Sequence, residues 1–505
     1  MMEHGLTPAR SLARQAAAVA AVTVILSLVS LVSTPFIFKH LGDASYGVLT
    51  TITLVSSYLL NLEFGFGYAT VRFLAKASAA GQADDEVAVA DTSRVVFAAA
   101  AIVGGGALCV FAGPLVDSVF HIPAPLLADA RRAFTLGGLI LAASFTTTGH
   151  SALIQARGRL VALSVQRLCI GLASTLAAVV SIAFGGRLVA VVATQCVVAW
   201  IGALSARSLA SRALGRRPAL RVHKRVLRAM ASYSGLSFAA GLAYQLMMTG
   251  PAVVLAARVS TAALPAFAIP NVVLQRLSQL VAAASASFFP FASAAAVGGG
   301  VHLQRVFRSH TRLQFLLAGP IAAYLAAFGK PLLAVWISAD FALRAATPLT
   351  LMTITALLLA VSSPAADVAR AYGHPGWVVL FTTTAAATGI ALSLRLSTSM
   401  GATGAAIAFT VSLALSAIPF TIIVASRLMN LSLPALLRDL SAPALAVTAL
   451  WLAWAAVAHR TGSPVAAISA GALLGCLYVV AGFRWLLQPA ERQALAAAVA
   501  LRPRR

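Results

Sequence analysis

The chain has 505 residues, of which 60% are hydrophobic and only 10% are charged. A soluble domain usually carries about 25% charged residues, so this composition excludes a soluble enzyme or binding module and indicates an integral membrane protein. The net charge of +24 comes from 37 Lys and Arg against 13 Asp and Glu. Because these cations lie between apolar segments, we expect anionic membrane lipids as their partner and no nucleic acid.

Apolar segments of about 20 residues, the length that crosses a bilayer as a helix, follow one another along the whole chain. There are about 14 of them in windows of about 19 residues. The predicted spans are residues 16–38, 48–71, 95–119, 133–154, 161–184, 188–205, 231–257, 264–291, 313–337, 349–369, 378–396, 402–426, 441–458 and 465–487. The sequence therefore predicts an all-α polytopic membrane protein.

The distribution of Lys and Arg predicts the orientation of these spans, because short cytoplasmic loops are rich in both residues. With both termini inside, inner segments hold them in roughly a three-to-one excess over outer segments. The most basic stretch follows the sixth span and contains Arg207, Arg212, Arg216, Arg217, Arg221, Lys224, Arg225 and Arg228. We therefore predict an N-terminal lobe (1–206), a basic cytoplasmic loop (207–230), a C-terminal lobe (231–426), and two further helices with a basic cytoplasmic tail (427–505).

Two motifs lie in the first predicted hairpin, between residues 35 and 75. An L-G-x-x-x-Y-G turn consists of Leu41, Gly42, Tyr46 and Gly47. A second motif consists of Glu63, Phe64, Gly65, Gly67, Ala69, Arg72 and Ala75. This hairpin resembles that of the polysaccharide and O-antigen flippases, members of the multidrug/oligosaccharidyl-lipid/polysaccharide exporter superfamily. In that family an Asp stands at the position of Glu63.

The resemblance continues more weakly at Pro290, at 371–373 (Ala-Tyr-Gly) and at 401–408, which begins Gly-Ala-Thr-Gly. Such relatives fold as two six-helix lobes around a central cavity, often with two extra helices. Many carry an Asp deep in the seventh span, where this chain has Met-Thr-Gly-Pro at 248–251.

The resemblance implies a flippase of a bacterial inner membrane. By alternating access it would move a polyprenyl-pyrophosphate-linked glycan to the outer leaflet for O-antigen or exopolysaccharide export. It also implies a monomer, with other polysaccharide assembly proteins as further partners. Two alternatives stay open: an ion-coupled multidrug exporter of the same superfamily, and a membrane-embedded polysaccharide polymerase or ligase. The latter would be an enzyme, but we find no catalytic constellation and expect none.

The eighth span carries the clearest cargo-binding candidates. Asn271, Gln275 and Gln279 share one helical face, which Arg276 extends. A polar stripe in hydrocarbon must face protein or water, and a guanidinium binds pyrophosphate oxygens in bidentate fashion. We therefore predict that Arg276 is the central cargo-binding cation. The alternative is an arginine that caps carbonyl groups of a helix bent at Pro270.

Other candidate cargo contacts are Arg72, Arg167, His150 and Tyr244. Each also has a structural interpretation, since Arg72 and Arg167 lie near the inner interface, where long cationic side chains extend toward the headgroups. His150 can simply be a packed polar residue.

Glu63 and Asp367 are the candidates for ion coupling. Glu63 has no oppositely charged partner one turn away and lies within a span, whereas Asp367 has Arg370 at i+3 and is predicted to form an ion pair. The four cysteines lie inside apolar segments without metal-ligand spacing. We accordingly expect neither a metal nor a cofactor.

Overall fold

The computed structural model describes residues 8–285, 300–460 and 463–481, and these are almost entirely helical. Among them there is no strand, and nine helices are long and apolar enough to cross a membrane. Two of the nine overlap two predicted spans each: Ala21–Leu60 covers parts of 16–38 and 48–71, and Pro375–Met429 contains 378–396 and 402–426. The predicted all-α membrane fold is confirmed, whereas the count of 14 stays a prediction. Pro290 and the predicted basic tail lie outside the described residues.

The chain divides into two compact units. Unit 1 comprises Met1–Gln245 and Ala256–Pro265, and unit 2 comprises Leu246–Leu255 and Ala266–Arg505. The chain passes from unit 1 to unit 2 after Gln245 and back to unit 1 after Leu255, and both boundaries fall inside one helix, α9 (Lys224–Arg258).

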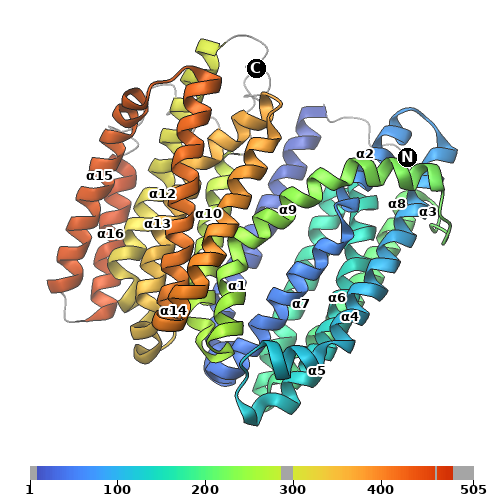
Figure 1. Cartoon of the computed structure of the whole chain (residues 1–505), viewed down its shortest axis with the longest axis horizontal. Coiled ribbons are helices and arrows are strands. Elements are labelled where there is room, and N and C mark those ends of the chain that lie inside the picture. The colour runs from blue at the N-terminus through green and yellow to red at the C-terminus, as the bar shows by residue number, and fades with distance from the viewer. Residues whose placement is uncertain (1–7, 286–299, 461–462, 482–505) are drawn as a thin grey trace. The chain divides into compact units, whose positions relative to one another are not determined.

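Unit 1 is built from long helices joined by short breaks. Its principal helices are α1 (Pro8–Leu60), α2 (Phe66–Ala79), α3 (Ala83–Ala100), α4 (Gly106–Val110), α5 (Ala112–Pro114), α6 (Leu127–Ala156), α7 (Leu160–Ala183), α8 (Leu188–Leu214) and most of α9. Helices α6, α7 and α8 pack side by side (Figure 1). Backbone approaches backbone where α6 meets the π-turn Ala101–Gly105, because a Cβ on Gly138 would lie 2.6 Å from the Gly105 carbonyl oxygen. Small residues allow such close packing of membrane helices.

Much of the segment 207–230, predicted as a basic loop between lobes, is helical. Helix α8 continues to Leu214 and α9 begins at Lys224, so only residues 215–223 lie outside helices. Ala, Leu and Arg favour helix extension, and Gly215 ends α8 in the left-handed conformation at φ 71°. The cations before residue 215 are therefore held on a rigid helix.

The first motif forms the turn of a helical hairpin inside α1. Gly42 adopts φ 74° and ψ 170°, values that separate two helical segments and that a residue with a Cβ rarely adopts. Gly47 lies against the segment after α9, since a Cβ there would stand 1.8 Å from the Thr261 carbonyl oxygen. The two motif glycines thus have different roles, one in the turn and one in a close backbone contact.

Unit 2 contains α10 (Pro265–Ser285) and five long helices. These are α12 (Gly300–Trp336), α13 (Ala339–Ala371), α14 (Pro375–Met429), α15 (Leu433–Arg460) and α16 (Pro464–Ala481). Helix α13 packs between α12 and α14, and α15 and α16 pack against α12 (Figure 1). Helix α14 bends at Gly401, which has φ 57°, and Gly404 then approaches the Leu396 carbonyl so closely that a Cβ would stand 2.0 Å from its oxygen.

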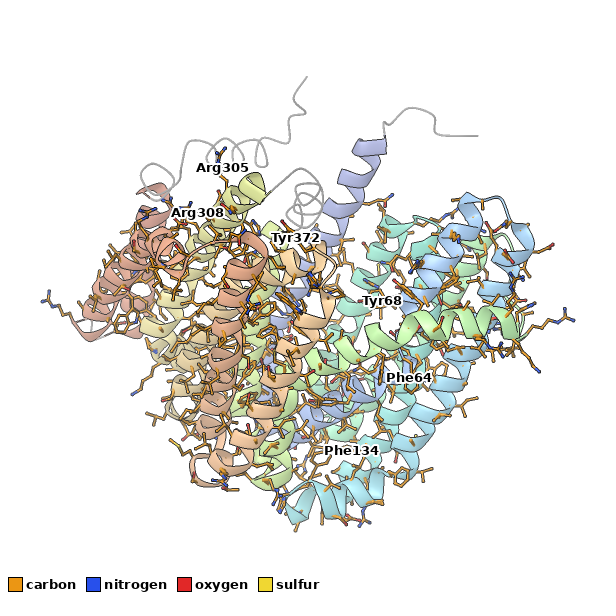
Figure 2. All side chains as sticks on the ribbon, turned by 45° about the horizontal axis from the view of Figure 1, so that its top comes forward. Phe64, Tyr68, Phe134, Arg305, Arg308 and Tyr372 are labelled. Carbon is orange, nitrogen blue, oxygen red and sulfur yellow. The ribbon has the colours of Figure 1, made fainter. Side chains whose placement is uncertain are left out.

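The two C-terminal helices are held to α12 by an aromatic cluster and an ion pair. Trp454 of α15 is fully buried, packs edge-on against Tyr324 and Phe328, and donates its indole N–H to the Gly471 carbonyl at 2.9 Å. Near the other end of α15, Arg308, labelled in Figure 2, pairs with Asp439. Both contacts join α15 to the rest of unit 2.

The contact between Gly47 and Thr261 predicts a stability effect. Gly47→Ala should destabilise the folded protein by about 1–3 kcal/mol, the usual cost of overpacking, because backbone must move to admit the methyl group. Gly106→Ala is the matched control, since Gly106 is helical with open space at its Cβ position; it should be neutral or stabilising by up to about 1 kcal/mol. Thermal unfolding of both variants in detergent measures the difference, and equal unfolding temperatures would contradict the contact.

Candidate functional site

The second motif forms a break in the membrane-spanning helix of the first hairpin. Helix α1 ends at Leu60, a 3₁₀ turn covers Asn61–Glu63, and α2 starts only at Phe66. Phe64 and Gly65 between them are left-handed, with φ 51° and 76°. The predicted span 48–71 is therefore not one continuous helix. Broken helices that expose backbone groups at membrane depth are a recurrent feature of transporter binding sites.

The Glu63 carboxylate lies at this break, against the first turn of α2. Both of its oxygens are 3.4 Å from the position that a Cβ of Gly67 would take, so the carboxylate lies in van der Waals range of this turn. Oε2 is buried and has no hydrogen-bond partner among the described residues. The N-terminal end of a helix favours a negative charge, which partly compensates for the burial. The motif thus places a titratable carboxylate in an otherwise apolar environment.

Helix α9 packs along the break through residues that belong to unit 1. Phe238 contacts Phe64 with ring centroids 4.8 Å apart, and Gln245 donates from Nε2 to the Ser57 hydroxyl at 2.9 Å. The Asn61 side chain donates to the Ser57 carbonyl at 3.0 Å. These contacts hold the unwound segment between α1 and α9; Figure 2 labels Phe64 in this segment and Tyr68 in the first turn of α2.

The predicted cargo residues of unit 1 occupy different places. Arg72 of α2 lies over the Tyr233 ring of α9, with its guanidinium carbon 4.3 Å from the ring centroid, an arrangement that stabilises a cation. Tyr244 is half-exposed on the same helix. Arg167 is exposed on α7, and its side chain has no hydrogen bond or ion pair within the described residues. The structure therefore brings Glu63 and Arg72 to one broken helix but does not join Arg167 to them.

In unit 2 the predicted stripe on α10 divides into buried and exposed members. Asn271 is buried and donates to the Met248 carbonyl at 3.5 Å, whereas Gln275 and Gln279 are exposed. Arg276 is half-buried, donates from Nη1 to the side-chain oxygen Oε1 of Gln279 at 3.1 Å, and keeps a buried Nε without a partner in the described part of the chain. Asn271 thus holds helices together, while Arg276 retains unused donors.

The predicted ion pair of Asp367 is confirmed. Arg370 donates from Nη1 to Asp367 Oδ1 at 2.8 Å, one turn along α13. Because the partner is already in place, this carboxylate is less suited than Glu63 to exchange a proton with a moving ligand.

Two clusters were not predicted from the sequence. In unit 1, His150 lines a cavity of about 200 Å³ together with Arg94 and Arg207. In unit 2, the Gln314 side chain lies 2.9 Å from the His310 ring and accepts a hydrogen bond from Ser363 at 2.7 Å. His310 and Gln314 are one turn apart on α12, so helical spacing alone would have grouped them. Nothing in the sequence pairs Arg94 with Arg207.

No protein-family model matches the sequence, and no curated protein sequence matches it. Solved structures do share its fold. The lipid II flippase MurJ in an inward closed conformation aligns with a TM-score of 0.71 at 10% identity, over 93% of this chain and 99% of MurJ. An inward-facing multidrug resistance MATE family transporter of the MOP superfamily aligns with a TM-score of 0.62 at 12% identity, over 81% of this chain and 98% of its own.

A MOP superfamily transporter from Pyrococcus furiosus aligns with a TM-score of 0.56 at 12% identity, over 83% of this chain and 96% of its own. These identities are low, so the likeness concerns the fold. The shared fold confirms the resemblance seen in the first hairpin as far as the fold is concerned. The chain has the multi-pass membrane fold of the MOP superfamily transporters, which include flippases and multidrug exporters.

Proposed function

We propose that the protein is a flippase for a polyprenyl-pyrophosphate-linked oligosaccharide that serves surface polysaccharide export, such as O-antigen or exopolysaccharide. It works by alternating access in the inner membrane of a bacterium, with both termini in the cytoplasm. The orientation follows from the excess of Lys and Arg in the predicted inner segments. Every residue role below is part of this proposal.

The observation that carries the proposal is the unequal pairing of charges. Seven acids of the described residues each lie within ion-pair distance of an arginine: Glu86, Asp91, Asp117, Asp129, Asp340, Asp367 and Asp439. Arg276, within an apolar helix, has only the neutral Gln279 as a described side-chain partner. A cation at membrane depth costs at least ~2.5–3.5 kcal/mol on insertion scales, which an anionic cargo would offset. Pyrophosphate is such an anion, and guanidinium binds it in bidentate fashion.

The likeness to the MurJ flippase supports the same assignment. It covers 93% of this chain, against 81% for the inward-facing MATE transporter. Lipid II is a polyprenyl-pyrophosphate-linked glycan, the cargo class that we propose here. Asn271, Gln275, Gln279, His150, Arg72, Arg167 and Tyr244 complete the proposed cargo-binding set.

An ion-coupled multidrug exporter is the second candidate, and Glu63 is the observation that favours it. Its carboxylate is buried at a helix break without a hydrogen-bond partner for Oε2 in the described ranges. Such a group exchanges a proton when its surroundings change. The two candidates differ in cargo, and coupling through Glu63 is compatible with both.

A direct test uses a deletion of the gene in its native host. Lipid-linked oligosaccharide should accumulate in the inner leaflet and surface polysaccharide should fall, because the carrier can no longer cross. The measurement is the fraction of carrier-linked glycan accessible from outside in spheroplasts. Unchanged glycan export together with altered efflux of cationic dyes would instead assign the protein to multidrug export.

Arg276→Ala should lower glycan export roughly tenfold or more, because a charge-assisted hydrogen bond contributes about 1.5–3 kcal/mol. Arg276→Lys should retain part of the activity, since the charge survives and the bidentate fork does not. Arg395→Ala is the matched control: this residue of unit 2 is exposed on α14 and forms no described ion pair. Export is measured at equal amounts of protein in the membrane. Normal export by the Ala variant would remove Arg276 from the cargo site.

Glu63→Gln should abolish the stimulation of transport by an imposed proton gradient, because the amide keeps the shape of the carboxyl group and cannot exchange a proton. Movement of cargo down its own gradient should persist. Asp340→Asn, which changes an exposed acid paired with Arg344, is the control. The measurement is transport into proteoliposomes with and without the gradient. Equal stimulation of wild type and Glu63→Gln would exclude Glu63 from coupling.

A further inference from the structure

Two arginines and a histidine line a partly enclosed cavity in unit 1, and the proposed function uses only the histidine. The cavity has a volume of about 200 Å³ and lies between α3, α6, α8 and the segment 215–223. Its lining residues are Arg94, Phe97, Ala98, Thr146, Gly149, His150, Leu153, Arg207 and Leu220. One ordered water needs only ~10–15 Å³ of such space, so the cavity accommodates a hydrated polyatomic ion.

The segment 215–223 is fixed in place by the buried Asp91 of α3. Its carboxylate oxygen Oδ1 accepts from Arg216 Nη2 at 2.7 Å and from the Ala219 backbone N–H at 2.8 Å. Thr92 accepts from the His223 backbone N–H at 3.1 Å, and Arg94 donates to the Pro218 carbonyl. The segment that carries Leu220 is therefore hydrogen-bonded to α3 at several points, and these bonds fix this wall of the cavity.

The lining contains positive charge and no carboxylate. Asp91 is already paired with Arg216, and no described acid lies within ion-pair distance of Arg94 or Arg207. Like charges that share a partly enclosed, low-dielectric space repel each other more strongly than in water. An anion between the two guanidinium groups would turn this repulsion into attraction. The remaining N–H donors of Arg94 and the fork of Arg207 suit tetrahedral oxyanions.

His150 adds a third polar contact of a different kind. Its Nδ1 lies 2.7 Å from the Thr146 carbonyl oxygen, so the neutral ring carries its proton on Nδ1 and offers Nε2 as an acceptor. An acceptor beside two cations selects a ligand that also carries a hydroxyl. A glycerol headgroup and a monoprotonated phosphate both meet this requirement.

We propose that the cavity formed by Arg94, His150 and Arg207 binds a phosphoryl oxyanion, carried by an anionic lipid headgroup or free in the aqueous phase. Arg207 also lines an open groove of about 660 Å³ with Ser208, Ser211, Arg212, Gly215, Arg216 and Arg217. The cavity and this cationic groove therefore share Arg207. The site lies within unit 1, and its two arginines are not among the proposed cargo contacts.

The test uses full-length protein purified in detergent and reconstituted in nanodiscs. One arm measures binding of inorganic phosphate by calorimetry in delipidated protein. The other measures retention of phosphatidylglycerol over phosphatidylcholine by native mass spectrometry. Wild type should bind in at least one arm, and the double variant Arg94→Gln/Arg207→Gln should bind roughly tenfold more weakly or not at all in that arm.

Two further variants make the result specific to the cavity. Arg159→Gln removes one exposed cation that forms no described ion pair and does not line the cavity, so it should bind like wild type. Ala98→Phe keeps both arginines and fills the cavity, so it should lose binding. This variant tests the site even if the double variant does not fold.

Loss in the lipid arm alone identifies a headgroup as the ligand, and loss in the phosphate arm alone identifies a free ion; either outcome supports the site. Three outcomes would overturn it: no binding by wild type in either arm, unchanged binding by both Ala98→Phe and the double variant, or equal losses in Arg159→Gln.

Discussion

Hydrocarbon offers no hydrogen-bond partner to a protein backbone, and the architecture of this protein depends on that constraint. The described residues satisfy it by being helical almost throughout. Departures from the helix occur where glycine permits them, as at Gly42 and Gly401, or where other side chains surround the freed groups. At the break around Phe64 and Gly65, side chains of α9 lie close to the segment. The irregular backbone is therefore confined to places that protein covers or turns occupy.

Close packing takes the place of the hydrophobic driving force that holds soluble helices together. Lipid is as apolar as Leu, so membrane helices associate by contact and by interhelical hydrogen bonds. Gly47 and Gly404 bring backbone against backbone within their units, and Gly471 leaves space for the rings of Phe328 and Tyr324. These glycines are needed for space, whereas Gly42 and Gly401 are needed for their dihedral angles.

Most acids of the described residues form ion pairs with arginines, whereas several arginines have no described acidic partner. Asp91 organises the segment after α8, Glu86 joins α3 to Arg157, and Asp439 joins α15 to α12 through Arg308. Replacing any of these acids would leave a cation without its partner, which is the costly way to break an ion pair. Among the arginines without a described ion pair, we propose Arg276 in unit 2 and Arg94 with Arg207 in unit 1 as contacts for anionic ligands. Both proposed ligand sites follow from this asymmetry.

The sequence by itself determined the fold class and the likeness in fold to MOP superfamily transporters. Composition and length are enough for the fold class, because a bilayer accepts only long apolar helices. The motif around Leu41 and Gly47 is local, so its turn could be read from the chain. The Asp367–Arg370 pair was likewise predictable, since helical spacing places the two residues together.

Only the tertiary structure decided which polar residues far apart in the sequence meet. The break at Glu63 depends on packing against α9, which follows it by well over a hundred residues, and no local signal shows where α9 lies. Asn271 and Gln275 look equivalent on a helical wheel, but one is buried against the Met248 carbonyl and the other is exposed. Arg94 and Arg207 share a cavity because Asp91 fixes the segment between α8 and α9. Contacts of such sequence separation depend on how helices pack, and that information is absent from periodicity, spacing and charge.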